Sequence, residues 1–164
     1  MKKAVIFFGL CVVSHVVFKM LEGIFYLNVT SSLQTGLYLK VPSTNYRRGD
    51  YVVYEPTEEV KNIIIQNKWG NAKYDFLKKV GAMAGDTYSV SSDTLIFEIN
   101  GRYIGQVYET DNKGNELPQL RGEFKVEEGY ILPIATSARS FDGRYSGTIP
   151  ESRIKAKVIP ILTW

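Results

Sequence analysis

Three short segments of the 164-residue chain hold most of the side chains that could act as nucleophiles, bases or their partners. The first supplies hydroxyl groups, the second two adjacent lysines, and the third a serine beside an acid and a base. A serine hydroxyl is a poor nucleophile until a base takes its proton, so the chemistry to consider is serine nucleophilic catalysis. The segments are residues 28–38 (NVTSSLQTGLY), 76–86 (FLKKVGAMAGD) and 140–147 (SFDGRYSG).

The composition narrows the choice of base. The chain has one cysteine, Cys11, and one histidine, His15, both in the same apolar N-terminal stretch. A single cysteine forms no internal disulfide and supplies no zinc site. A histidine inside an apolar helix is badly placed for a Ser-His-Asp triad, and we interpret His15 as a polar residue tolerated there. Lysine, glutamate, aspartate and tyrosine remain as proton acceptors.

Each segment alone also has an ordinary structural explanation. A cluster of serine and threonine after a membrane segment is usually a polar turn, and Lys78-Lys79 is by default a solvated strand end. Gly85-Asp86 and Asp142-Gly143 are common turn dipeptides. A function can therefore be predicted only from the three segments taken together.

The first element that must position these segments is an apolar run from Ala4 to Leu21. As a helix it spans about 27 Å, close to the thickness of the hydrocarbon core of a bilayer. The sequence therefore predicts one transmembrane helix within residues 1–25. A cleaved signal peptide is the alternative, but no small-x-small cleavage site follows the apolar run, which favours a retained anchor.

Charge around the anchor predicts its orientation. Lys2 and Lys3 precede the apolar run and favour a cytoplasmic N-terminus by the positive-inside rule. Residues 26–164, which we expect to form one domain, would then lie outside the cytoplasm. The net charge of the whole chain is only +3, with basic and acidic residues interspersed. That pattern argues against nucleic acid as a partner.

The remainder of the chain is predicted to be mainly β. Asn100-Gly101 is the strongest hairpin signal, because a type I′ turn needs positive φ at both positions. A short helix is expected from Thr57, its N-cap, to Trp69, with Gly70 ending it. Residues 90–128 are expected to form an inserted β subdomain, with a polar loop at 110–116. Strand patterns occupy residues 36–41, 50–56, 86–109, 123–135 and 153–164.

In this order, the three segments resemble the boxes of the type I signal peptidase family of Ser/Lys proteases. The resemblance is strongest to its conjugative-transfer branch, the TraF-type peptidases that mature pilin. The family's first box has the form Asn-x-Thr/Ser-x-Ser-x-Pro-x-Gly-x-Tyr. Here Gln34 replaces the proline, and the other places are matched by Asn28, Thr30, Ser32, Gly36 and Tyr38.

The second and third boxes follow with two further departures. The lysine box of the family ends in Pro-Gly-Asp, and Ala84 replaces its proline here. The last box has the form Ser-x-Asp-Ser-Arg-Tyr-x-Gly, and Gly143 replaces its second serine. The matched residues of these two boxes are Phe76, Leu77, Lys78, Lys79, Gly85, Asp86, Ser140, Asp142, Arg144, Tyr145 and Gly147.

The resemblance implies a role for each residue of the site. Ser32 is the nucleophile, and Lys78 rather than Lys79 is the general base, since the first lysine of the pair occupies the catalytic place. Thr30, together with the backbone N–H of Ser32, forms the oxyanion hole. Ser140 hydrogen-bonds the lysine amine and orients it.

The family's chemistry needs a neutral lysine amine and uses no metal or cofactor. A lysine with an ordinary pKa is protonated at neutral pH, so its amine must be buried in apolar surroundings. Phe76, Leu77 and Val80 are expected to supply those surroundings. Asp142 and Arg144 are expected to form a supporting ion pair beneath the loop that carries Ser140.

The resemblance implies a signal-peptidase-like β-sheet domain held in a bacterial inner membrane by one helix, with the catalytic domain in the periplasm. Its partners would be the lipid bilayer and a precursor protein, such as a pilin, with small residues before the cut. Leu33 and the segment after Met83 are expected to line the substrate pockets.

The outcome of the reaction and two alternatives stay open. The acyl-enzyme is resolved by water, or by the N-terminal amine of the substrate to give a cyclic pilin. A general signal peptidase for secretory preproteins, or an inactive membrane-anchored assembly protein on the same scaffold, would share the pattern. The brevity of the chain and the Gly-Leu-Tyr ending of the first box favour the conjugative branch.

Overall fold

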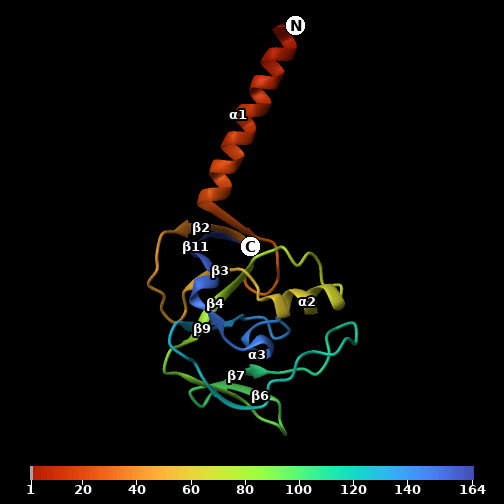
Figure 1. The fold of residues 1–164 in the computed structure, drawn as a ribbon, viewed down its shortest axis with the longest axis vertical. Coiled ribbons are helices and arrows are strands. Elements are labelled where there is room, and N and C mark those ends of the chain that lie inside the picture. Colours follow the sequence, from red (N-terminus) through yellow and green to blue (C-terminus); the bar gives the residue numbers. More distant parts are fainter. Residues whose placement is uncertain (1) are drawn as a thin grey trace.

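A computed structural model of the chain describes residues 2–164, and the side chains from residue 6 onward. Helix α1 (Lys2–Ile24) stands away from a body of two β-sheets (Figure 1). The stretch Ile6–Ile24 has a mean hydropathy of 1.6, none of its residues is buried in the protein, and it is long enough to cross a membrane. The helix thus fits the predicted single-pass anchor.

The larger sheet has seven strands in the order β1-β2-β11-β3-β4-β9-β10, and every neighbouring pair is antiparallel. The mainly β class predicted from the sequence is therefore confirmed. Its strands are β1 (Phe25–Asn28), β2 (Gly36–Val41), β3 (Tyr51–Tyr54), β4 (Phe76–Met83), β9 (Tyr130–Ile134), β10 (Ile149–Pro150) and β11 (Ile154–Thr163).

A smaller sheet of four antiparallel strands follows β4 in the sequence, in the order β7-β6-β5-β8. Asn100 and Gly101 join two of its strands with φ values of 50° and 69°, as the predicted type I′ turn requires. The strands are β5 (Thr87–Val90), β6 (Ile96–Ile99), β7 (Arg102–Gln106) and β8 (Gly122–Lys125).

The two sheets share a hydrophobic core. Tyr88 and Phe97 of the small sheet belong to the same buried cluster as Ala82 and Leu132 of the large sheet. The junction is fixed by Asp86, which accepts from Asn100 Nδ2 (2.9 Å), the Met83 N–H (2.9 Å) and the Arg48 guanidinium. Burial alone would raise the pKa of this carboxyl, but these bonds hold it below its ordinary value.

Helix α2 (Glu58–Gln66) begins after Thr57, as predicted, but ends three residues before Trp69. Lys68 takes a left-handed conformation with φ of 54°, and the Trp69 N–H donates to the Ile64 carbonyl (3.0 Å). This pattern of bonds is a Schellman motif, which satisfies the last carbonyls of a helix. The prediction that Gly70 ends the helix is therefore wrong, because Lys68 already reverses the chain.

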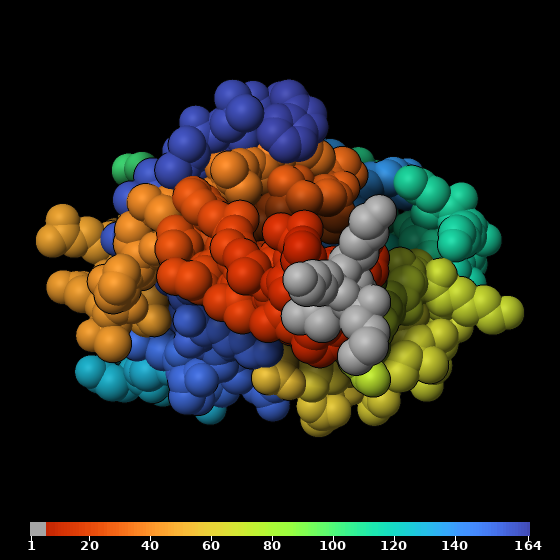
Figure 2. All heavy atoms as spheres, turned by 90° about the horizontal axis from the view of Figure 1, so that it is seen from above, coloured from red at the N-terminus to blue at the C-terminus, as the bar shows by residue number. Residues whose placement is uncertain are grey.

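Two short elements complete the body: α3 (Gly143–Ser146) and the 3₁₀ helix η1 (Glu151–Arg153). Seen from above, the C-terminal residues, in dark blue, lie beside the orange residues that follow α1 in the sequence (Figure 2). The Lys40 side chain of β2 donates to the Glu22 carbonyl of that helix (2.6 Å). Several apolar side chains at this end are exposed: Leu27, Val29, Ile159, Ile161, Leu162 and Trp164.

Candidate active site

The three sequence segments meet at one place, where a continuous chain of polar atoms links their side chains. Lys78 lies on β4, Ser32 in the loop between β1 and β2, and Ser140 in the turn before α3. The Lys78 amine donates to Ser140 Oγ (2.9 Å), and Ser140 Oγ donates to Ser32 Oγ (3.0 Å). Ser140 is thus the bridge between the amine and the serine hydroxyl.

Burial governs the protonation of Lys78. Its side chain is only 4% exposed, and its amine lies 5.3 Å from the centre of the Phe76 ring. Burial lowers the pKa of Lys78 to about 8, although the negative charge of Asp142 acts in the opposite direction. A useful fraction of the amine is therefore neutral near physiological pH, as a general base requires.

The alternation of side chains along β4 separates the two adjacent lysines. Successive residues of a strand point to opposite faces of the sheet. Lys78 faces the serines, whereas the amine of Lys79 lies 4.9 Å from the centre of the Tyr51 ring. Only the first lysine of the pair is brought into the site.

The loop that carries Ser32 is organised by one buried side chain, Asn28. Its Nδ2 donates to the carbonyls of Thr30 (3.1 Å) and Gln34 (2.9 Å), while its Oδ1 accepts from the N–H and hydroxyl of Thr30. The Tyr38 hydroxyl also donates to the Gln34 carbonyl (2.7 Å). Two side chains therefore fix the turn at the position where the sequence lacks the family's proline.

Thr30 lines the same cleft as Ser32, but its hydroxyl donates to Asn28 Oδ1 at 2.8 Å. The carbonyl of Ser32 accepts from the Ser137 N–H (3.2 Å), which ties the loop that carries Ser32 to the segment that leads to Ser140. Among the hydrogen bonds formed by residues 2–164, none uses the backbone N–H of Ser32 as donor. That N–H is free to bind a substrate.

A buried ion pair fixes the segment around Ser140. Arg144 meets Asp142 through two bonds of 2.9 Å, and both side chains are almost wholly buried. The same guanidinium donates to the carbonyls of Ala138 and Ser137, each at 2.8 Å. Such fork-shaped recognition uses the planar geometry of arginine. The pair thus holds the backbone that presents Ser140.

Gly143, which replaces the serine of the family's last box, lies where a side chain does not fit. A Cβ atom there would stand 2.6 Å from the Pro133 carbonyl oxygen and 2.7 Å from Leu132 Cδ1. The close packing of α3 on β9 explains the glycine.

A cleft of about 120 Å³ opens beside Ser32 and Lys78. Three lining residues, Tyr26, Asp75 and Phe141, were not predicted, because nothing in their spacing marks them, although Phe141 directly follows Ser140. The expected lining was also wrong at Leu33, which is 4% exposed and packs in the core. The walls of the cleft are Tyr26, Thr30, Ser32, Asp75, Phe76, Leu77, Lys78 and Phe141.

Metal ligands do not gather at this site. Within the described part of the chain, no three side chains of histidine, cysteine, aspartate or glutamate lie close enough to hold a metal ion.

Comparisons with known proteins identify a family by its sequence model and, separately, several similar proteins. The family model described as "Signal peptidase, peptidase S26" matches residues 1–164. Two plasmid transfer proteins TraF of Escherichia coli are 28% and 27% identical to the chain over 149 residues, covering 84% of it and 82% of each relative. A crystal structure of a signal peptidase I from Enterococcus faecalis aligns with a TM-score of 0.39 and 17% identity, covering 69% of this chain and 96% of that one.

Proposed function

The chain belongs to the S26 family of signal peptidases, and on that premise we propose that it matures a conjugative pilin precursor, with Ser32 as nucleophile and Lys78 as general base. The family consists of serine peptidases, so the substrate is a protein. The observation that carries the proposal is the continuous contact from the Lys78 amine through Ser140 to Ser32.

The proposed reaction begins with the neutral form of Lys78. Once the two hydrogen bonds reverse their direction, the Ser32 hydroxyl gives its proton to Ser140 Oγ, and Ser140 gives its own proton to the neutral amine, as the Ser32 oxygen attacks the scissile carbonyl. Ser140 thus orients the amine and relays the proton. The resulting ammonium gives its proton to the leaving amine when the C–N bond breaks. An acyl-enzyme on Ser32 remains, and water or a substrate amine resolves it.

The oxyanion of this reaction would be held by two donors. The backbone N–H of Ser32 is the first, since it has no acceptor among the described residues. The Thr30 hydroxyl is the second, and it must turn away from Asn28 Oδ1 to reach the oxyanion. A donor of this kind is worth about 3 kcal/mol in the transition state.

The size of the cleft supports a substrate with a small residue before the cut. Its volume of about 120 Å³ leaves little room for a large side chain. The two TraF relatives are plasmid transfer proteins, which supports a role in conjugation and hence a pilin precursor as substrate.

Residues 1–25 would anchor the peptidase domain, residues 26–164 with an insertion near 90–128, in a bacterial inner membrane. The N-terminus would lie in the cytoplasm and the catalytic domain in the periplasm. The exposed apolar side chains of Ile161, Leu162 and Trp164 lie at the end of β11, which pairs with β2, and β2 contacts the base of α1 through Lys40. Their exposure beside the anchor supports contact with the lipid bilayer.

The test is to co-express the full chain with the pilin precursor of its transfer system and to measure the mass of the product. Ser32→Ala and Lys78→Met should each abolish processing, because such residues act as a unit worth more than about 10³-fold in rate. Lys79→Met is the matched control and should retain processing.

The outcomes distinguish the possible errors. Normal processing by Ser32→Ala or Lys78→Met would refute the dyad. Loss of processing only in Lys79→Met would show that the wrong lysine was assigned. A product one water lighter than the linear form would identify cyclisation.

A further inference from the structure

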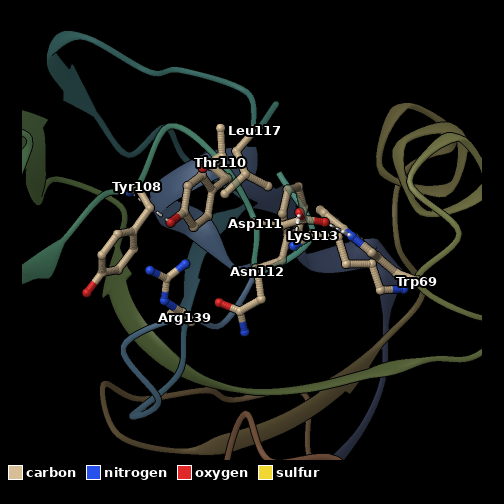
Figure 3. A pocket seen from close by; sticks show the side chains of 10 residues that line it. Trp69, Tyr108, Thr110, Asp111, Asn112, Lys113, Leu117 and Arg139 are labelled. Atoms are coloured by element: carbon tan, nitrogen blue, oxygen red, sulfur yellow. Dashed lines mark hydrogen bonds between the residues drawn. The ribbon is translucent and has the colours of Figure 1, made fainter. Parts of the chain in front are cut away.

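A second hollow, of about 280 Å³, adjoins the catalytic cleft. Phe141 lines both hollows, and Arg139, the residue before Ser140, lies at the rim of the second one. The segment that presents Ser140 to Lys78 therefore also forms one side of this pocket. Figure 3 shows Arg139 and Tyr108 on one side of the pocket and Trp69 on the other.

Aromatic side chains form the wall of the pocket. The Phe141 ring stacks on Tyr145 with centroids 5.5 Å apart and planes inclined by 10°. Trp69 packs against Phe141 at 5.1 Å, and the Tyr145 hydroxyl accepts from the Tyr108 N–H (3.1 Å). These contacts hold the wall in place without a ligand, so the pocket is preformed.

The only carboxylate in the lining is already occupied by donors of the protein. Asp111 accepts from Trp69 Nε1 (2.7 Å), from Asn115 Nδ2 (2.7 Å) and from the backbone N–H of Lys113 (2.7 Å). Burial would raise its pKa, but these donors hold the pKa far below its ordinary value. Asp111 therefore stays ionised and fixes the loop rather than waiting for a cation.

The positive charges at the rim are not occupied in this way. The Arg139 guanidinium lies 4.2 Å from the centre of the Tyr108 ring and is exposed. Among the residues that the structure describes, no carboxylate forms an ion pair with Arg139 or Lys113. The rim thus keeps two cations available for an anionic group, one of them stacked on an aromatic ring.

We propose that this pocket is a second recognition site for the precursor, which takes one large apolar or aromatic side chain followed by an acidic residue. The inference rests on the proposed peptidase function. The volume is at the lower limit for small-molecule pockets and suits a single bulky side chain. Because an extended peptide advances about 3.3 Å per residue, a substrate that passes Phe141 reaches the pocket within a few residues of the cut.

The experiment uses the purified full chain in detergent micelles and internally quenched peptides. Each peptide carries alanines before the cut in a Gly/Ser background, and a Phe-Asp pair is moved one position at a time along both sides. At one position, Phe-Asp should raise kcat/KM about tenfold over Ala-Ala, the scale of discrimination that an apolar pocket provides. Phe-Lys at that position should gain less.

Two variants test the assignment to this pocket. Arg139→Glu changes an exposed residue and should reverse the preference for Phe-Asp over Phe-Lys. Thr110→Trp, also at an exposed position of the lining, should fill the pocket and remove the gain from Phe. Arg102→Glu is the matched control, because Arg102 is an exposed arginine of β7 outside both hollows, and it should behave like the wild type.

The peptide assay distinguishes a wrong second site from a wrong peptidase function. Cleavage of all peptides at equal rates, or an unchanged preference in both pocket variants, would overturn the second site while the peptidase function stands. If the wild type cleaves no peptide or cleaves no faster than Ser32→Ala, the proposed function falls and the second site with it.

Discussion

The catalytic cleft and the aromatic pocket lie on either side of Phe141, yet they are built in different ways. The cleft takes its reactive groups from a central strand and two loops tied to the core, and Lys78 and Ser140 are both buried. The pocket is formed by the turn after α2 and by the loop that contains Asp111, with Arg139 exposed. The contrast indicates that the cleft rests on buried and hydrogen-bonded supports, whereas the pocket is built from more exposed loops.

The two regions also use a cation in opposite ways. Burial lowers the pKa of Lys78 to about 8, so that the amine is available as a neutral base. Arg139 stacks on Tyr108 in contact with solvent, where a guanidinium remains charged. In the two proposals the cleft needs Lys78 without its charge, whereas the pocket needs Arg139 with its charge. The two sites should therefore respond differently to pH and to mutation.

The largest effect is expected where both regions share a support. Arg144→Met leaves Asp142 as a buried carboxylate without its cation and frees the carbonyls of Ser137 and Ala138. Removing one partner of a buried pair costs about 3–5 kcal/mol. We therefore expect that loss in the free energy of unfolding, measured by urea denaturation.

The matched control is Arg102→Met, which removes an exposed arginine and should change the free energy of unfolding by less than about 0.5 kcal/mol. If Arg144→Met were as stable as this control, the ion pair would not be the shared support. Equal losses in peptide cleavage and in Phe-Asp preference would show that cleft and pocket depend on it together.

The pH profile should separate the cleft from the pocket. In the proposed reaction Lys78 is a neutral base with a pKa of about 8, so kcat/KM should fall about tenfold per pH unit below that value and level off above it. The preference for Phe-Asp over Ala-Ala should stay constant from about pH 6 to pH 9, because the proposed contact does not use the Lys78 amine. A flat kcat/KM profile, or a preference that follows it, would contradict the assignment.

The pH dependence of the free energy of unfolding tests the pKa of Lys78 independently. Its pKa is lower in the folded protein than in the unfolded chain, so the unfolded state holds more protons between about pH 8 and pH 10. The free energy of unfolding of the wild type, measured relative to Lys78→Met, should therefore rise with pH in this window, by up to about 1.4 kcal/mol per unit. Taking the difference cancels the buried tyrosines, whose raised pKa values act in the opposite direction near pH 10 in both proteins.

Much of the secondary structure could be predicted from the sequence, because local sequence patterns determine it. The apolar run predicted α1, and Asn100-Gly101 predicted a turn that has positive φ at both positions. The end of α2 was missed because a lysine, Lys68, takes the left-handed conformation that is usually assigned to glycine. The hydrogen bonds of the Lys68 and Trp69 N–H groups form only in the folded turn, so composition alone does not reveal them.

The candidate site was predictable only where a motif existed. The motif resemblance selected Ser32, Lys78 and Ser140, and the structure places these three side chains in contact. The aromatic pocket has no such motif. Trp69, Tyr108 and Phe141 are far apart in sequence and meet only through tertiary packing, which periodicity and spacing do not encode.

The smallest effect is expected at the turn after β4, which lines neither region. The Asp86 N–H donates to the Met83 carbonyl (2.9 Å), and Gly85 has a φ of 90°, so Ala84 occupies the second position of a type II turn. Proline is favoured at that position, and Ala84 is exposed. Ala84→Pro should raise the free energy of unfolding by about 0.4–1 kcal/mol, because it restricts the unfolded chain.

Ala84→Pro also tests whether a change outside both hollows leaves them unaffected. Since Ala84 touches neither hollow, Ala84→Pro should stabilise the protein while kcat/KM and the Phe-Asp preference stay at wild-type levels. Ala84→Gly is the matched control and should lower stability instead, because glycine frees the unfolded chain. If Ala84→Pro destabilised the protein, the turn would not be type II. If it changed cleavage of Ala-Ala peptides, strain at the end of β4 would reach Lys78, and the rigid strand would not insulate the catalytic cleft from its surroundings.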